Sequence, residues 1–252
     1  MEGESLRRTF RAYALQFETV NCDFERNYSR FLSLLNFCEK ESLVVAPEVF
    51  PTGFCYERVD EAVKFSERVC RELLSFSEGL EVTLVFTVFE RVNGKLFNSV
   101  KVFDRGREVL SRPKVKLFPP TGETDYFTAG SLSDLKVAET SLGVIAPVIC
   151  FELRFYPVLE RLKSLGGEVF TVSAQWGRAR KFHWDLFVKT RAVELQRFFV
   201  AANGTGREMA GSSLIVDPWG RVLSEAGDSE GVISGNIDTA VISQVERKLP
   251  LS

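Results

Sequence analysis

Three polar residues lie at positions where an α/β protein can build a catalytic site: Glu48, Lys114 and Cys150. Glu48 and Cys150 each follow a short apolar run, so we expect both at the tips of buried strands. Lys114 begins a long segment without sustained periodicity, which is predicted to be a loop. Strand ends and long loops are the usual places for sites. Taken singly, however, each residue also has a structural interpretation, as a core cysteine or a solvated charge.

The residue types suggest nucleophilic rather than metal chemistry. Cys150 occupies a turn from strand to helix, where free backbone N–H groups can favour a thiolate and hold an oxyanion. His183 is the only histidine in the chain, which excludes a centre with several histidine ligands. Any catalytic base is therefore expected to be a carboxylate such as Glu48.

The elements that position these residues form one α/β pattern without linkers or repeats, so a single domain spanning residues 1–252 is predicted. The turn at Asn93–Gly94 indicates a hairpin. The predicted helices cover 23–40, 63–76, 153–165 and 181–196, and the loop of Lys114 covers 114–130. The predicted strands cover 13–17, 42–46, 82–89, 99–103, 143–149, 168–173, 198–202, 212–216 and 232–237.

Composition narrows the class of protein. The 252 residues carry a net charge of −2, which gives no electrostatic case for nucleic acid or an anionic membrane as a partner. No apolar run reaches the roughly 18 residues of a membrane helix. The first residues lack the apolar stretch of a signal peptide, so a cytoplasmic location is expected.

The five cysteines are widely spaced, odd in number and contain no CxxC pair. This pattern predicts neither a disulfide framework nor a zinc site. The cysteines are Cys22, Cys38, Cys55, Cys70 and Cys150.

Three ordered segments resemble the signatures of the nitrilase superfamily of carbon–nitrogen hydrolases. They are 44–48 (VVAPE), 112–117 (RPKVKL) and 148–155 (VICFELRF). The resemblance extends over nearly the whole chain, through segments 96–99, 123–130, 184–194, 199–203 and 212–220.

The resemblance implies a four-layer α-β-β-α sandwich of two mixed β-sheets. It also implies that Cys150 is the nucleophile, Glu48 the general base and acid, Lys114 the oxyanion-stabilising cation, and Glu123 a second carboxylate that orients the site. The implied reaction is hydrolysis of a linear amide through a thioester, without a metal or an organic cofactor. The backbone N–H of Phe151 is expected to join Lys114 in stabilising the oxyanion.

The sequence departs from the superfamily pattern at two places. Lys116 stands where a histidine is usual, and a second ammonium group there is expected to lower the pKa of Lys114. Phe151–Glu152 replaces the frequent Tyr–Asp pair, and Glu152 keeps the charge for a structural role.

Segment 173–184 resembles the omega-amidase branch, which hydrolyses the terminal amide of small dicarboxylate monoamides. Arg178, Arg180 and Lys181 are candidates to bind a substrate carboxylate, and Arg180 is preferred because it lies nearest the helix start. A solvated charge cluster explains the same three residues equally well. Trp176 and Tyr126 are further predicted substrate contacts, whereas His183 is expected to be structural.

Other functions remain open at this stage. Within the enzymes, the alternatives are an N-carbamoyl amino acid hydrolase or another aliphatic amidase, and a true nitrilase is less favoured. From a different class, the chain could be an inactive binding protein on the same fold. The resemblance also implies a homodimer or a higher homo-oligomer that pairs through helix 153–165 and the C-terminal segment.

Overall fold

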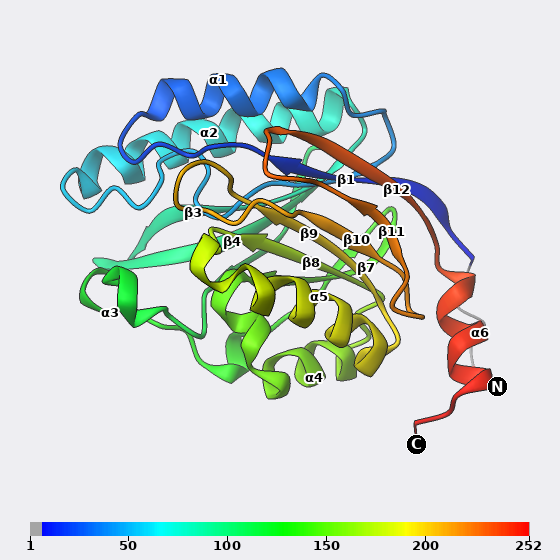
Figure 1. Cartoon of the computed structure of the whole chain (residues 1–252). Coiled ribbons are helices and arrows are strands. Elements are labelled where there is room, and N and C mark those ends of the chain that lie inside the picture. Colours follow the sequence, from blue (N-terminus) through cyan, green and yellow to red (C-terminus); the bar gives the residue numbers. More distant parts are fainter. Residues whose placement is uncertain (1–6, 252) are drawn as a thin grey trace.

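Two six-stranded sheets form the centre of the protein (Figure 1). The computed structural model describes residues 7–251. In the first sheet the strand order is β12-β1-β2-β3-β4-β5. Its strands are β1 (Thr9–Gln16), β2 (Leu43–Val45), β3 (Thr83–Val92), β4 (Lys95–Asp104), β5 (Arg107–Pro113) and β12 (Gly231–Asp238).

The second sheet has the order β11-β10-β9-β8-β7-β6. Strands β7, β8 and β9 run parallel to one another, and the outer pairings are antiparallel. Its strands are β6 (Ala138–Thr140), β7 (Gly143–Ile149), β8 (Val169–Ala174), β9 (Phe198–Asn203), β10 (Leu214–Val216) and β11 (Val222–Glu225). Both sheets are therefore mixed.

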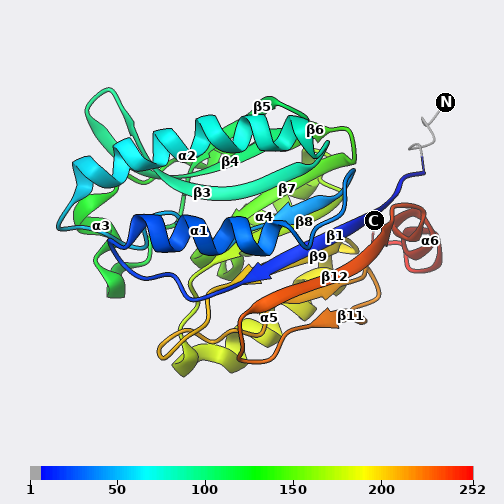
Figure 2. The same ribbon diagram turned by 90° about the horizontal axis from the view of Figure 1, so that it is seen from above.

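Helices cover the outer faces of the two sheets (Figures 1 and 2). Helices α1 (Phe24–Leu35) and α2 (Val59–Gly79) lie on the first sheet, and α4 (Tyr156–Ser164) and α5 (Lys181–Leu195) lie on the second. The remaining helices are α3 (Glu123–Tyr126) and α6 (Ala240–Lys248), with 3₁₀ turns at Pro119–Thr121, Leu132–Asp134, Cys150–Arg154 and Arg178–Arg180. The predicted four-layer sandwich is confirmed.

Burial of one face of each helix explains this layering. On α1, Tyr28, Phe31, Leu34 and Leu35 are buried against the apolar face of the first sheet. Their spacing of three and four residues places them on one stripe, as the sequence pattern predicts. A second apolar core fills the space between the two sheets and extends under α4 and α5.

The parallel strands bring the predicted site residues together. Strands β1, β2 and β3 are parallel in the first sheet, so the chain leaves the carboxyl end of β2 just before Glu48. The Glu48 backbone N–H donates to the carbonyl of Ala174, the last residue of β8 (3.3 Å). The carboxyl ends of β2 and β8, which belong to different sheets, are therefore adjacent.

Several boundaries differ from the sequence prediction. Strands β5 and β6 and helix α6 were not expected, and the helix predicted from residue 153 begins as a 3₁₀ turn before α4 starts at Tyr156. Pro157 occupies the first turn of α4, where its missing N–H is tolerated. The short strand β6 and the charged strand β5 lie at the edges of their sheets, where apolar alternation is weak.

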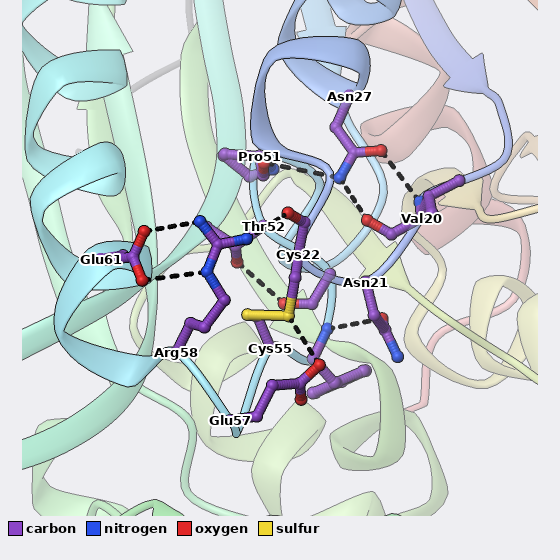
Figure 3. Close-up of a disulfide and its surroundings, with 12 residues drawn as sticks. Val20, Asn21, Cys22, Asn27, Pro51, Thr52, Cys55, Glu57, Arg58 and Glu61 are labelled. Atoms are coloured by element: carbon purple, nitrogen blue, oxygen red, sulfur yellow. Dashed lines mark hydrogen bonds and ion pairs between the residues drawn. A yellow bond between two sulfur atoms is a disulfide. The ribbon is translucent and has the colours of Figure 1, made fainter.

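The expectation of no disulfide is wrong for one pair of cysteines. Cys22 and Cys55 form a disulfide between two loops, with Cα atoms 5.0 Å apart (Figure 3). The two residues are 33 positions apart, and only the fold brings them together. Cys38, Cys70 and Cys150 are free thiols.

Within residues 7–251, no helix has the length and apolar character needed to span a membrane.

Candidate active site

Glu48 is held at a strained bend directly after β2. The next residue, Val49, has φ +41°, an unfavourable value for a β-branched side chain. The Val49 N–H donates to the hydroxyl of Thr87 on β3 (2.5 Å), which helps to fix this bend. Strain of this kind persists only where surrounding contacts enforce it, and it is common at functional sites.

Lys114 lies between two buried carboxylates. Its Nζ is 2.6 Å from Glu48 Oε1 and 2.7 Å from Glu123 Oε1. The side chains of all three residues are at most 1% exposed. The structure therefore brings Glu48, Lys114 and Glu123 into one ionic cluster, although the lysine and Glu123 come from a loop and the short helix α3.

The electrostatics of the cluster keep Lys114 charged. Burial alone would lower the pKa of Lys114, but the negative charges of Glu48 and Glu123 outweigh it and raise that pKa. The expectation that Lys116 lowers the pKa of Lys114 is wrong. The Lys116 ammonium lies 5.0 Å from the centre of the Phe155 ring, in a cation–π contact.

Cys150 lies at the turn after β7 with φ +39°, a second strained residue of the site. Burial and the charge of Glu48 raise the pKa of its thiol well above the ordinary value, while Lys114 acts in the opposite direction. The expectation that the turn favours a thiolate is therefore wrong, because the resting thiol is protonated at neutral pH. Attack by this sulfur requires a base that takes the proton, and Glu48 is the nearby candidate.

A buried ion pair joins the segment of Lys114 to the turn of Cys150. Arg112 donates to both carboxylate oxygens of Glu152, at 2.9 and 2.8 Å. The same carboxylate accepts the backbone N–H groups of Val115 and Ile149, at 2.7 and 2.8 Å. Glu152 thus fixes residues beside both Lys114 and Cys150, which is a structural role.

Three polar groups that the sequence analysis did not select orient the two carboxylates. Asn98 Nδ2 donates to Glu48 Oε1 (2.8 Å), and the Gln175 N–H donates to Glu48 Oε2 (3.3 Å). The Phe118 N–H donates to Glu123 Oε2 (2.9 Å). Asn98 lies in segment 96–99, which resembles the superfamily, and this resemblance is the sequence feature that could have identified it as a site residue.

A small pocket opens on Cys150. It is lined by Phe118, Cys150, Phe151, Arg154, Gln175, Trp176 and Arg180, and its free volume is about 20 Å³. A single water molecule needs about 10–15 Å³ of such volume. The lining side chains therefore leave only a small space beside the thiol.

The predicted substrate-binding residues divide into two groups. Phe151, Trp176 and Arg180 line the pocket. Arg178 instead pairs with Asp228 (2.9 Å), and Lys181 pairs with Asp185 (2.9 Å). Both ion pairs lie outside the pocket lining, so of the three alternative candidates only Arg180, the preferred one, lies at the pocket.

Tyr126 also lies outside the pocket lining. Its ring stacks on Tyr56, with centroids 4.2 Å apart and planes 6° from parallel. Tyr126 belongs to α3, the same short helix that carries Glu123. The pocket lining therefore gives no support to the predicted substrate contact, and Tyr126 stacks on Tyr56 with 47% of its surface exposed.

Arg154 is the pocket residue that sequence reasoning missed. Its guanidinium lies 5.0 Å from the centre of the Trp176 ring and hydrogen-bonds to His183 Nδ1 (2.9 Å). Partial burial and then the charge of Arg180 lower the pKa of Arg154. Within the described part of the chain, neither Arg154 nor Arg180 has a carboxylate partner at ion-pair distance. The pocket thus places two guanidinium groups without anionic partners near the Cys150 thiol.

The fold and the cluster define a class of protein. A four-layer sandwich with a buried thiol beside a lysine and two carboxylates is the arrangement of a cysteine-dependent hydrolase. The chain belongs to the carbon–nitrogen hydrolase family of the nitrilase superfamily, because the family model matches residues 11–247. It is a carbon–nitrogen hydrolase that acts on amides.

Individual relatives agree with this class. The chain is 32% identical over 228 residues to the 2-oxoglutaramate amidase of Bacillus subtilis, covering 85% of this chain and 86% of the relative. It is 26% identical over 265 residues to a deaminated glutathione amidase of Synechocystis, covering 96% and 97% of the two chains. A crystal structure of a CN-hydrolase superfamily protein from Xanthomonas campestris superposes with a TM-score of 0.88 at 24% identity, covering 96% and 95% of the chains.

The carboxylate cluster predicts a pH dependence near neutrality. Burial raises the pKa of Glu123 to about 7, although Lys114 opposes the shift. As the pH rises through about 7, Glu123 loses its proton and becomes a charged partner that holds the Lys114 ammonium in place for the oxyanion. We expect kcat/KM to rise across this range, and we expect Glu123→Gln to remove the rise. An unchanged pH profile in Glu123→Gln would assign the titration to another group.

The same shift has a defined sign for stability. Glu123 is protonated more readily in the folded protein than in the unfolded chain, whose ordinary pKa is 4.5. Its contribution to the free energy of unfolding is fully present below about pH 4.5 and is lost as the pH rises through about 7. Urea unfolding of an inactive Cys150→Ala background with and without Glu123→Gln measures this contribution separately from catalysis.

Proposed function

We propose that the protein hydrolyses the terminal amide of a small dicarboxylate monoamide, as an omega-amidase does, and releases ammonia. The observation that carries this proposal is the pair of guanidinium groups, Arg154 and Arg180, in the pocket that contains Cys150. A guanidinium fork matches a carboxylate, and burial in a small pocket strengthens the contact. The 2-oxoglutaramate amidase of Bacillus subtilis, a 32% identical relative, acts on a substrate of this kind.

The first half of the reaction forms a thioester. Glu48 removes the proton from the Cys150 thiol as the sulfur attacks the amide carbon. The carbonyl oxygen becomes an oxyanion, which the Lys114 ammonium and the Phe151 N–H stabilise. Glu48 then gives its proton to the departing nitrogen, so the C–N bond breaks and ammonia leaves.

The second half returns the enzyme to its starting state. Glu48, again a carboxylate, removes a proton from a water molecule that attacks the thioester carbon. The C–S bond breaks, the acid product leaves, and Cys150 regains its proton from Glu48. Asn98 and Gln175 hold Glu48 throughout with their N–H groups, so one carboxylate serves both halves.

An ammonia-release screen tests the proposed substrate class. The panel contains glutaramate, succinamate, 2-oxoglutaramate, N-carbamoyl amino acids, simple aliphatic amides and nitriles. We expect the highest kcat/KM on the monoamides that carry a second carboxylate. A preference for carbamoyl amino acids or for uncharged amides would replace the proposed substrate with one of those classes. Absence of turnover on every amide would favour an inactive binding protein.

Arg180 provides a direct test of carboxylate recognition. A charge-assisted hydrogen bond is worth about 1.5–3 kcal/mol, so Arg180→Gln is expected to lower kcat/KM for succinamate by about 10- to 100-fold. Uncharged amides of similar length should change little, because they do not make this contact. Arg178→Gln is the matched control, since its partner Asp228 lies outside the pocket. Equal losses on charged and uncharged amides would show that Arg180 is structural.

We also propose that the protein forms a homodimer or a multiple of one. Apolar side chains on the outer face of α5 are exposed, with Phe182 74%, Leu186 49% and Val193 50% accessible. Tyr156 on the neighbouring helix α4 is 40% accessible. A self-complementary contact between two copies would bury these side chains. Sedimentation equilibrium at micromolar concentration is expected to give at least twice the 28.4 kDa chain mass, and a strict monomer would contradict the proposal.

A further inference from the structure

The disulfide ties the loop that follows Glu48 to a second loop near the N-terminal end of α1. Cys22 lies between β1 and α1, and Cys55 lies between Glu48 and α2 (Figure 3). Cys55 is fully buried, whereas Cys22 is only partly buried. Cys22 is therefore the more exposed residue of the pair.

A short path leads from this disulfide to the catalytic cluster. Cys55 is followed by Tyr56, whose ring stacks on Tyr126 of α3. Helix α3 also carries Glu123, which holds Lys114 at 2.7 Å. The path thus runs through one peptide bond, one aromatic stack and one turn of helix.

Other aromatic rings surround Tyr56 beside α3. Its ring centroid is 5.9 Å from that of Phe127 and 6.4 Å from that of Phe89. Its hydroxyl is buried and has no hydrogen-bond partner among the described residues. Burial and then the charges of Glu123 and Glu48 raise the pKa of this hydroxyl. Tyr56 therefore contacts α3 through its ring and not through a hydrogen bond.

Hydrogen bonds fix the loop mainly before Cys55. The Cys22 N–H donates to the Thr52 carbonyl (2.9 Å), and the Phe54 N–H donates to Asn21 Oδ1 (3.0 Å). After Cys55, Arg58 Nη1 contacts the Cys22 carbonyl at 3.2 Å from an exposed position (Figure 3). The disulfide is the covalent link at the point where the chain leaves the hydrogen-bonded turn and enters Tyr56.

We propose that the Cys22–Cys55 disulfide is a thiol-responsive element that positions the Tyr56–Tyr126 stack against α3, so that its reduction by a dithiol lowers the catalytic rate. This proposal goes beyond the proposed substrate class and requires only that the enzyme turns over an amide.

The redox step is an exchange with a dithiol reductant. A thiolate of the dithiol attacks Cys22 Sγ, the bond between the two protein sulfurs breaks, and Cys55 leaves and takes up a proton. The second thiol of the reductant then attacks the mixed disulfide, which frees Cys22 as a thiol. The protein gains two electrons and two protons, and the reductant ends as a cyclic disulfide.

In the reduced protein, a carboxylate lies close enough to accept a hydrogen bond from the Cys22 thiol. Glu57 Oε1 lies 3.1 Å from Cys22 Sγ, and after reduction the thiol can donate a hydrogen bond to this carboxylate (Figure 3). The three potential ligand atoms of Cys22, Cys55 and Glu57 lie within 4.8 Å of one another. In the oxidised protein the sulfurs are bonded to each other and cannot act as thiolate ligands.

The test compares oxidised and reduced full-length protein. Dithiothreitol reduces the enzyme, the reagent is removed without oxygen, and peptide mass spectrometry after alkylation confirms free Cys22 and Cys55. We expect kcat to fall by about 3- to 30-fold, because a misplacement of about 1 Å far from the reacting atoms costs about 10²-fold and a smaller shift costs less. KM should change less, because neither Arg154 nor Arg180 contacts Tyr56 or Tyr126. The double variant Cys22→Ser/Cys55→Ser should have the kcat of the reduced enzyme, and dithiothreitol should not change it.

Matched variants separate this proposal from a purely stabilising disulfide. Cys38→Ser/Cys70→Ser keeps the pair and should keep the dithiol response. Tyr56→Phe should retain activity and the response, whereas Tyr56→Ala should lower kcat as reduction does. If reduction lowers only the melting temperature and leaves kcat unchanged at 25 °C, the disulfide is structural and the proposal fails. It also fails if Tyr56→Phe loses as much activity as Tyr56→Ala, or if an oxidant cannot join the two cysteines.

A readout without substrate keeps this test independent of the proposed function. The rate at which iodoacetamide alkylates Cys150, followed on its own peptide, depends on the same cluster. We expect that rate to fall on reduction in parallel with kcat. The ratio of kcat in the reduced enzyme to kcat in the oxidised enzyme can be measured on any amide that the enzyme hydrolyses. An error in the proposed substrate class would therefore not change the outcome of this test.

Discussion

Replacement of Cys150 by alanine is expected to abolish amide turnover, with a loss of at least about 10³-fold in kcat. The reason is that no other group in the pocket can form the thioester. The fold should remain intact, because the change removes one sulfur atom and alanine tolerates the φ of +39° no worse than cysteine does. The expected cost in unfolding free energy is about 1 kcal/mol.

Mass spectrometry supplies the second arm of this prediction. Rapid quenching with substrate should leave an acyl group on the Cys150 peptide, and iodoacetamide at that residue should inactivate the enzyme. Cys70→Ala is the matched control, because Cys70 is a free thiol outside the pocket. An active Cys150→Ala variant, or inactivation that follows alkylation of Cys38 or Cys70, would show that the nucleophile is assigned wrongly.

The sequence predicted site residues best where a chemically reactive side chain directly follows an apolar strand pattern. Glu48 and Cys150 follow buried strands, and a strand end followed by a polar residue is visible without a structure. Glu123 had no such pattern of its own. It was predicted from the resemblance, and the structure places its carboxylate 2.7 Å from Lys114.

Contacts between distant segments were beyond the reach of sequence patterns. Arg154 lies four residues after the nucleophile, and only the packing of its guanidinium against Trp176 shows that it faces the pocket. Conversely, Arg178 and Lys181 are cations of the kind that bind anions, but Asp228 and Asp185 neutralise their charges. Partners that neutralise a charge can come from anywhere in the chain, so spacing alone does not distinguish Arg180 from its neighbours.

The same limit applies to the disulfide and to the edge strands. Cys22 and Cys55 have no diagnostic spacing, and the loops that carry them lie side by side only in the folded chain. Strand β5 contains three charged residues in seven positions and pairs along one side with β4. Its pairing comes from the long hairpin, which a search for apolar alternation does not detect.

Replacement of Lys114 by methionine is expected to lower kcat by about 10²- to 10³-fold, the usual cost of removing one oxyanion donor. The variant should also lose about 3–5 kcal/mol of unfolding free energy at pH 8, because Glu48 and Glu123 are left buried without their cation. In the intact cluster Lys114 lowers the pKa of Glu123, so without the ammonium that pKa rises further above its ordinary value. Because a protonated carboxyl group needs no cation, the stability deficit should shrink toward pH 5 and grow as the pH rises.

The double variant Lys114→Met/Glu123→Gln separates the two roles of the lysine. Removing one of the stranded carboxylates should restore much of the stability at pH 8, whereas activity should stay low because the oxyanion still lacks the ammonium. Lys116→Met is the matched control, since Lys116 contacts the Phe155 ring and not the carboxylates. Urea unfolding across pH and ammonia release measure the two effects. If the double variant regains activity together with stability, Lys114 serves only to neutralise the buried carboxylates, and another group must stabilise the oxyanion.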